Sequence, residues 1–232
     1  DDQNIMTINY NHEILGVDPL TGNINKKMDD TYAAYTAVWS PQGDRILSSA
    51  HNRGGTESYN AIWDFQAETD ILMVPNRDDN TVIGPMDWSP DGSQFATQYS
   101  EGNNDYFIRI YDAQDGSLIR STDRMNFNTH NIEWDPRNRW IALNQMILIV
   151  LIDATTMEND TIMDDFYYDG KEGLQTINSI EWSNDGRLLA ACGNSHNARI
   201  WVFDDSVILE DISDSLWAID VPEAAARDVN MG

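Results

Sequence analysis

The side chains that could do chemistry in this 232-residue chain are four histidines, one cysteine and 39 carboxylates. No His-x-x-x-His or Cys-x-x-Cys spacing occurs in the sequence, so a zinc site is not predicted. We expect the four histidines, His12, His51, His130 and His196, to be exposed loop residues. The sequence also has no Gly-x-Ser-x-Gly nucleophile elbow and no phosphate-binding glycine loop. It therefore favours a protein that is not an enzyme and that binds no cofactor.

Two acidic clusters have the donor types that calcium prefers, namely carboxylate and amide oxygens. The first contains Asp164, Asp165 and Asp169, and the second runs from Glu101 to Asp105. Neither has the full Asp-x-Asp-x-Asp-Gly pattern with a glutamate at position twelve. Asp164, Asp165 and Asp169 are thus candidates for a cation, against the alternative of an acidic surface loop.

The charge of the chain limits the classes of partner that it can bind. The formal net charge is −25, and the acidic residues are 29 Asp and 10 Glu against 3 Lys and 11 Arg. Such a surface repels nucleic-acid backbones and anionic lipids. The longest apolar run has only seven residues, 146 to 152, whereas a membrane helix needs about 20. We therefore expect no nucleic-acid binding and no membrane insertion. The Asp-rich, Lys-poor composition favours an extracellular, periplasmic or high-salt cytoplasmic setting.

A repeat near 48 residues organises the chain. Tryptophans at 39, 88, 134 and 182 each precede a polar turn that reads Ser-Pro-Gln-Gly, Ser-Pro-Asp-Gly, Asp-Pro-Arg-Asn or Ser-Asn-Asp-Gly. Gly and Asn tolerate the positive φ of hairpin turns, so each copy predicts a strand, a tight turn and a second strand. A third strand ending in Asp follows, as in Ile108-Arg109-Ile110-Tyr111-Asp112, and then a short fourth strand. Four short strands per repeat are typical of a propeller blade.

These motifs resemble the WD-repeat β-propeller superfamily, with the match extending over residues 4 to 210. The Trp-Ser-Pro-Asp-Gly turn, the Ile-Trp-Val-Phe-Asp strand at 200–204 and the Asp-x-x-Thr-Gly turn at 18–22 carry the resemblance. The family's Gly-His before the first strand is missing, so we expect its His–Ser–Asp–Trp network to be missing too. The loop containing Asn52-Arg53-Gly54-Gly55 is similar to Tol-type periplasmic propellers. The resemblance implies an all-β fold of four-stranded antiparallel blades.

The strand pattern predicts a single propeller domain over residues 1–221, followed by a C-terminal tail at 222–232. Blades begin near residues 34, 83, 131 and 177. Three strands within residues 4–28 and one at 215–221 form a shared fifth blade, which would close the ring and remove its free edges. The alternative is an incomplete part of a propeller of six to eight blades.

The regular placement of most tryptophans indicates packing between blades. Trp140 and Trp217 break the pattern and are the better candidates for exposure. The single cysteine, Cys192, lies in an apolar run and is expected in the core.

The resemblance implies a non-enzymatic scaffold that mediates protein–protein interaction or assembly through a rim of loops. We call the following residues the loop rim: His51, Arg53, Glu57, Glu101, Asn103 and Asp105. A partner with a basic surface, or one held within a larger assembly, suits the negative charge. Two alternatives stay open: a propeller that binds carbohydrate or calcium, and a propeller domain that accompanies an enzyme. Fold alone does not choose among them.

Overall fold

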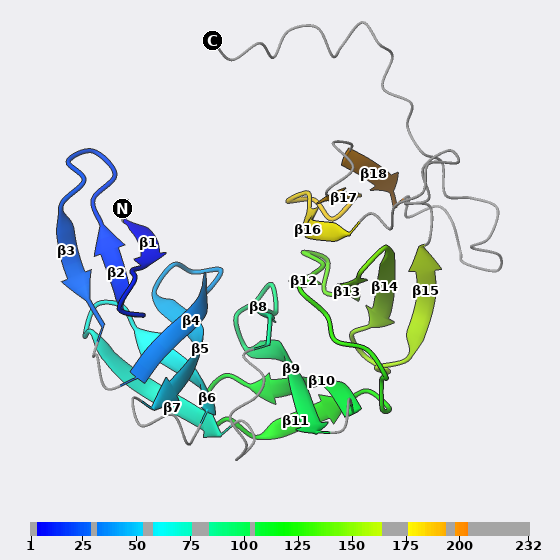
Figure 1. Ribbon diagram of the computed structural model, residues 1–232, viewed down its shortest axis with the longest axis horizontal. Coiled ribbons are helices and arrows are strands. Elements are labelled where there is room, and N and C mark those ends of the chain that lie inside the picture. Colours follow the sequence, from blue (N-terminus) through cyan, green and yellow to red (C-terminus); the bar gives the residue numbers. More distant parts are fainter. Residues whose placement is uncertain are drawn as a thin grey trace, which may run out of the picture.

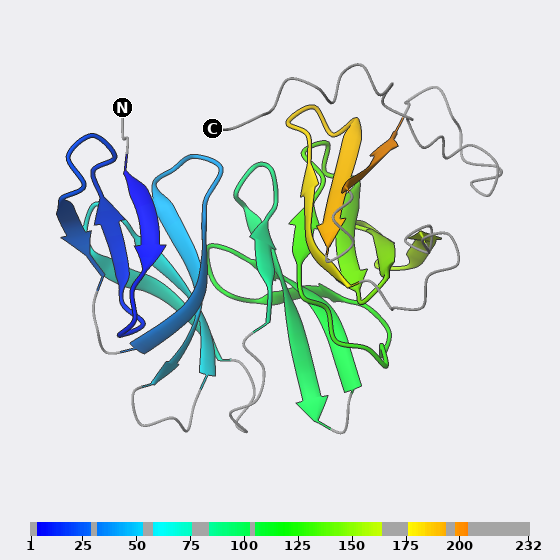
Figure 2. The same ribbon diagram turned by 45° about the horizontal axis from the view of Figure 1, so that its top comes forward.

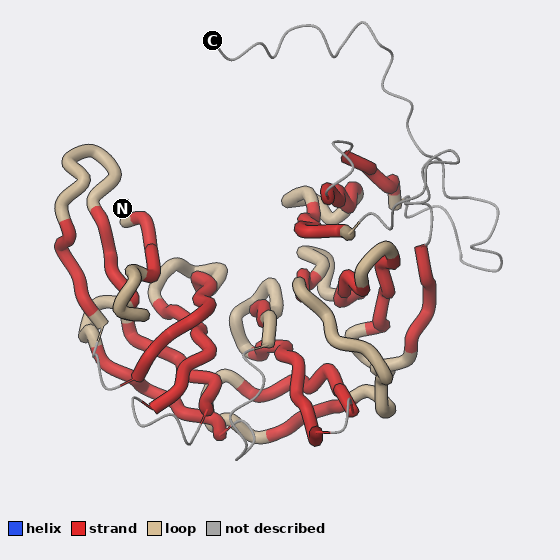
Figure 3. The backbone as a smooth tube through the Cα atoms, in the orientation of Figure 1, coloured by secondary structure: helices blue, strands red, loops and turns tan. Residues whose placement is uncertain are grey.

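The computed structural model describes residues 4–28, 32–52, 58–75, 84–102, 105–163, 176–193 and 198–203. All regular secondary structure in these ranges is β-strand (Figure 3). No helix in these ranges is long and apolar enough to cross a membrane. The chain is therefore all-β over its described length, as the repeat predicts.

Within the described ranges, eighteen strands form five antiparallel sheets. The first sheet contains β1 (Ile5–Ile8), β2 (Ile14–Val17) and β3 (Ile24–Lys27). The second contains β4 (Tyr32–Trp39), β5 (Arg45–Asn52), β6 (Ser58–Asp64) and β7 (Thr69–Pro75). The third contains β8 (Met86–Trp88), β9 (Gln94–Gly102), β10 (Asp105–Asp112) and β11 (Leu118–Ser121). The fourth contains β12 (Ile132–Trp134), β13 (Trp140–Gln145), β14 (Leu148–Asp153) and β15 (Asn159–Met163). The fifth contains β16 (Ile177–Trp182), β17 (Leu188–Gly193) and β18 (Ala198–Val202).

The five sheets follow one another around an arc (Figure 1). The tryptophan-bearing strands β4, β8, β12 and β16 lie on its inner side, and β3, β7, β11 and β15 lie on its outer side. Among the described residues, the first and last sheets share no strand pairing. The described chain is thus an incomplete propeller. The proposed closing strand at 215–221 and the tail at 222–232 lie outside the described residues.

Antiparallel order gives the arc two different faces. The β2–β3, β4–β5, β8–β9 and β16–β17 turns lie together along the upper side of Figure 2. We call this side the turn face, and the opposite side, where β1 runs into β2, the loop face. Because strand direction alternates, the third-to-fourth strand turns also belong to the turn face, and the second-to-third strand connections belong to the loop face. The described residues of the predicted loop rim, His51, Glu101 and Asp105, therefore belong to the loop face.

The turns form as the repeat predicts. The residue four positions after each repeat tryptophan has a positive φ, between 62° and 72°, at Gly43, Gly92, Asn138 and Gly186. The aspartate that ends each third strand caps the next turn, accepting backbone N–H bonds from the residues two and three positions later. The four such aspartates are Asp18, Asp64, Asp112 and Asp153. The turn face is therefore acidic because its architecture uses carboxylates as turn acceptors.

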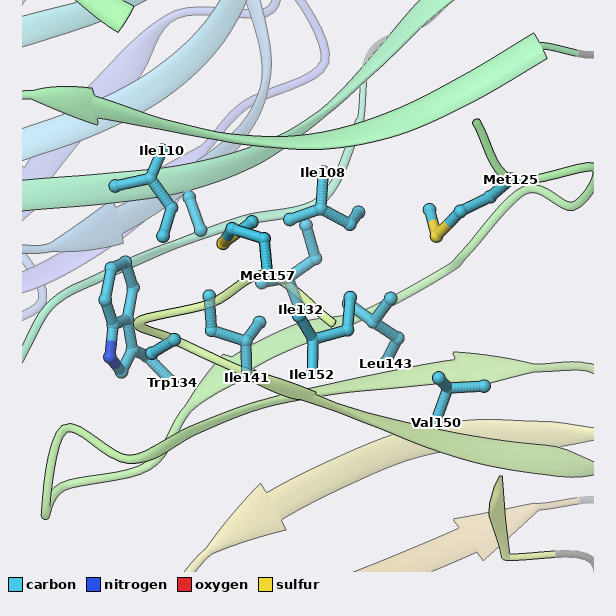
Figure 4. Close-up of a cluster of buried hydrophobic side chains, with 12 residues drawn as sticks. Ile108, Ile110, Met125, Ile132, Trp134, Ile141, Leu143, Val150, Ile152 and Met157 are labelled. Atoms are coloured by element: carbon cyan, nitrogen blue, oxygen red, sulfur yellow. The ribbon is translucent and has the colours of Figure 1, made fainter. Parts of the chain in front are cut away.

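The apolar core lies between neighbouring sheets. In one interface, Ile108 and Ile110 of β10 face Ile132, Trp134 and further residues of the fourth sheet, all of them buried (Figure 4). Side chains of this size contribute about 1.5–3 kcal/mol each when removed from water. The repeat tryptophans share this role, since Trp88, Trp134 and Trp182 are at most 5% exposed. Their predicted packing between blades is confirmed.

One part of the hydrogen-bond network that we expected to be missing is present. The indole N–H of Trp63 donates to Ser48 Oγ at 2.7 Å in the second sheet, and both side chains are buried.

Two expectations about single residues are wrong. Trp140 is only 3% exposed, because it lies in the core between the fourth and fifth sheets with Trp182 and Trp201. Cys192 is exposed, although its sequence neighbours are apolar. Cys192 lies ten residues after Trp182. The equivalent residues of the third and fourth sheets, Gln98 and Asn144, face the sheet that follows them. The last described sheet has no described neighbour on that side. Trp217 lies outside the described residues.

Candidate functional site

The loop rim is described in part. The structure describes His51, Glu101 and Asp105, whereas Arg53, Glu57 and Asn103 lie outside the described residues. Glu101 and Asp105 come from the facing ends of β9 and β10, where the ladder shifts register between Asp105 and Tyr106. The ends of β9 and β10 therefore place both Glu101 and Asp105 at the loop face.

Glu101 belongs to a small ordered group on the third sheet. Its Oε1 accepts a hydrogen bond from Arg109 Nη2 at 3.1 Å. The guanidinium of Arg109 lies 3.5 Å from the centroid of the Tyr99 ring, which is a close cation–π contact. The Glu101 side chain is about half exposed, whereas that of Arg109 is mostly covered. In this group, the partly buried guanidinium of Arg109 holds the carboxylate of Glu101 at the surface.

Asp105 pairs with a second arginine. Asp105 Oδ1 accepts a hydrogen bond from Arg124 Nη1 at 2.7 Å. Arg124 is well exposed, so the pair adds little stability. Arg124 precedes Met125, which pairs with Tyr106 through backbone hydrogen bonds. The β9–β10 end of the rim therefore presents carboxylates paired with arginines. Sequence reasoning did not single out Arg109 or Arg124.

His51 differs from the other described rim residues and from the expected exposed histidine. Its side chain is buried, with 7% exposure, although it lies near the loop face at the end of β5. The ring makes an edge contact with Tyr35, whose ring in turn lies against His12. Burial lowers the pKa of His51. The residue is a packed, neutral group at physiological pH and presents no surface to a partner.

The cation candidates Asp164, Asp165 and Asp169 lie outside the described residues. Among the residues that the structure describes, no three His, Cys, Asp or Glu side chains are grouped so as to hold a metal ion.

A second group of titratable residues lies on the inner strands. Asp87, Glu133 and Glu181 directly precede Trp88, Trp134 and Trp182 on β8, β12 and β16. Asp87 joins two sheets: its Oδ2 accepts from the backbone N–H of Trp134 at 2.6 Å, and its Oδ1 accepts from its neighbour Trp88 at 2.8 Å. The repeat thus places three carboxylates on consecutive inner strands.

Their electrostatics depart from ordinary carboxylates. Burial, together with smaller effects of the negative charges of Asp87 and Glu181, raises the pKa of Glu133 to about 9. Burial also raises the pKa of Asp87 to about 6, while the two backbone N–H groups that it accepts oppose this shift. At neutral pH Glu133 is therefore protonated and uncharged beside an ionised Asp87. The pair of Asp87 and Glu133 therefore holds one proton at neutral pH.

Sequence reasoning missed this inner group. The available signal was the residue before each repeat tryptophan, which reads Val, Asp, Glu and Glu in the four copies. Three acidic residues at one repeat position predict carboxylates on neighbouring inner strands. The large number of acidic residues in the chain does not by itself predict this. In a chain with 39 carboxylates, the repeat position carries the information.

Residues 48–206 match the model of the "ELP1 first N-terminal beta-propeller" family, which is more than half of the chain. No curated protein matches the sequence. The matched residues begin within β5 and extend just beyond β18, so they include the second-to-third strand connections of the loop face and the inner carboxylates. The chain therefore belongs to the family of ELP1 first N-terminal β-propellers.

Proposed function

We propose that this chain is a non-enzymatic, WD-repeat-like scaffold that binds a protein partner through its loop rim. The observation that carries the proposal is the ordered group at the β9–β10 ends. There Arg109 is stacked on Tyr99 and holds Glu101 at the surface, next to the Asp105–Arg124 pair. Aromatic and arginine residues are the usual anchors of interfaces. Membership of a propeller family supports a scaffold role.

A partner with a basic surface suits this rim. The net charge of −25 attracts basic proteins over long distances and repels acidic ones. Glu101, about half exposed, offers a carboxylate whose position is fixed before binding. Preorganisation of this kind lowers the entropy lost on association.

The test compares two charge reversals of the same type. Glu101→Lys changes the loop rim, and Glu158→Lys makes the same change in the β14–β15 turn on the turn face, where Glu158 is exposed. The immobilised wild type and both variants are used to capture proteins from the source organism, and bound proteins are quantified by mass spectrometry. A partner that the wild type and Glu158→Lys retain and Glu101→Lys loses supports the proposal. Equal loss by both variants would indicate general charge attraction and would contradict a rim site.

Two alternatives are tested alongside. Thermal stabilisation by millimolar calcium, or quenching of tryptophan fluorescence by sugars, would favour a ligand-binding propeller. An activity that copurifies stoichiometrically with the captured partner would favour a propeller domain that accompanies an enzyme.

A further inference from the structure

The interface between the second and third sheets changes character from the turn face toward the loop face. Near the turn face it is apolar, with Leu47 and Ile62 packed against Phe95 and Tyr111. Side chains alternate between the two faces of a strand, so the next residues on these same faces are Ser49, Asn60, Thr97 and Arg109. The strand registers confirm that these residues lie side by side within each sheet, since Ser49 pairs with Asn60 and Thr97 pairs with Arg109. A polar layer therefore follows the apolar one.

Several polar atoms in and beside this layer are buried without a hydrogen-bond partner. They are Ser49 Oγ and Asn60 Oδ1 on the second sheet, Arg109 Nε on the third sheet, and His51 Nδ1 one step nearer the loop face. The exposed fractions of Ser49, Asn60 and His51 are 2%, 1% and 7%. Buried polar groups in native proteins nearly always have a partner, and leaving one without a partner is unfavourable. Four such atoms in one interface call for a partner between the sheets.

Equivalent positions in the other sheets show what Ser49 lacks. Gln98, ten residues after Trp88, accepts from the backbone N–H of Thr129 at 2.7 Å and donates to Asn128 at 2.6 Å. Asn144, ten residues after Trp134, donates to the carbonyl of Ile177 at 2.9 Å. Each long amide reaches the segment that leads into, or begins, the next sheet. The side chain of Ser49, ten residues after Trp39, is one or two bonds shorter and makes no such bond among the described residues.

The unpartnered atoms identify the chemistry of the missing partner. Asn60 Oδ1 only accepts, so it needs a donor, and Arg109 Nε only donates, so it needs an acceptor. An anion would leave Asn60 without a partner, and an ammonium ion would leave Arg109 without one. Ser49 and His51 accept or donate. A hydroxyl-bearing molecule both donates and accepts, so it is the kind of ligand that can partner each of these four atoms.

We propose that the interface between the second and third sheets binds a neutral hydroxyl-bearing ligand, water or a small polyol, through Ser49, Asn60, His51 and Arg109. Buried water typically makes about three hydrogen bonds to polar groups that lack other partners, which fits this set. The ligand takes the place that the long amide side chains take in the next two interfaces. The site shares His51 with the loop rim and Arg109 with the group that holds Glu101. The tests below measure stability and electron density rather than partner capture, so their failure would leave the proposed function standing.

The first test uses the sign of a stability change. If the interface is occupied, Ser49→Ala and Asn60→Leu break hydrogen bonds to the ligand and lower the thermal midpoint by about 2–4 °C each. If the interface is empty, the same substitutions remove unpartnered polar atoms, and the midpoint stays the same or rises. Asn144→Leu is the control, because its amide has partners within the chain and its loss lowers the midpoint in both cases. An unchanged or raised midpoint in both Ser49→Ala and Asn60→Leu would overturn the proposal.

The second test identifies the ligand. A crystal structure of the wild type, grown without polyols at 1.8 Å resolution or better, shows density between Asn60 and Arg109 if the site is filled. Erythritol is then added to wild type and to both variants during thermal unfolding. A larger rise for the wild type than for the variants indicates a polyol, and an equal rise in all three indicates water, because osmolytes stabilise all folded chains alike. A dry interface, or an anion in this density, would contradict the proposal.

Discussion

Asp87 on β8 accepts a hydrogen bond through Oδ2 from the backbone N–H of Trp134 on β12, with 2.6 Å between the two atoms. The residue before the repeat tryptophan in one sheet thus holds the backbone of the repeat tryptophan in the next. Trp134 also lies in the apolar core between the same two sheets. A polar contact and an apolar contact therefore fix β12 against β8 at the same residue. The carboxylate that makes this bond lies near the negative charge of Glu181 and beside the raised-pKa carboxyl of Glu133, which gives the inner strands a pH dependence.

Replacing Glu133 with Gln should stabilise the protein at neutral pH and above. In the unfolded chain a glutamate ionises near 4.5, whereas burial raises the pKa of Glu133 to about 9 in the folded chain. Between these values the unfolded state releases a proton that the folded state keeps, so stability is lost as the pH rises. Gln cannot ionise and removes this loss, by up to about 3 kcal/mol at pH 7.

Urea unfolding at pH 4 and pH 7.5 measures this effect. At pH 4 the variant and the wild type should agree, because Glu133 is protonated in both states. Glu181→Gln is the control, since Glu181 is exposed and should give a small change. A gain of equal size at both pH values would show that ionisation of Glu133 is not its cause.

Alanine at the turn glycines should destabilise the protein unequally. Gly43 and Gly186 both have a φ near +70°, which disfavours any L side chain by roughly 1 kcal/mol. A Cβ at Gly43 meets open space, whereas a Cβ at Gly186 would overlap Asp135 Oδ1 and approach Arg137. Asp135 is completely buried, so it has little room to move. We expect Gly43→Ala to cost about 1 kcal/mol and Gly186→Ala at least twice as much, measured by urea unfolding. Equal costs would mean that the neighbouring turn gives way freely.

Asn138 should show two separable contributions. It takes the place of the turn glycine with a φ of 62°, and its Oδ1 accepts from the indole N–H of Trp134 at 2.9 Å. Asn138→Gly keeps the backbone conformation and loses only the hydrogen bond, at about 1 kcal/mol. Asn138→Ala loses the bond and adds strain, for a total of about 2 kcal/mol. Thermal or urea unfolding of the two variants gives the order. If Asn138→Gly is more destabilising than Asn138→Ala, strain from the left-handed backbone does not determine which residue is tolerated at position 138.

The ring-closing strand remains a prediction that hydrogen exchange can test. The first sheet has three described strands, and β1 has a described partner only on its β2 side. A strand at 215–221 paired with β1 would protect the backbone N–H groups of β1 that point away from β2. Removing residues 215–232 should then make those amides exchange faster while β13 is unaffected. Fast exchange of these β1 amides in the full chain would argue for an open ring.

Much of the fold follows from the repeat, because its signals are local. Strand, turn and strand are encoded within about ten residues around Trp88 and Trp182, and the positive φ at Gly92 and Gly186 is a property of the turn itself. The Asp caps are local too, since each accepts from residues two and three positions later. Burial of Trp88, Trp134 and Trp182 follows from their regular placement.

The sites were decided by contacts between sheets, which no local pattern contains. Trp140 is buried because the fifth sheet covers it, and Cys192 is exposed because no described sheet covers its side of β17. His51 is turned away from the surface although it stands at a strand end. Sequence by itself therefore determined the blades and their turns, where a few neighbouring residues set the backbone. Only the tertiary structure decided which polar side chains meet, because burial and pKa depend on how one sheet packs against the next.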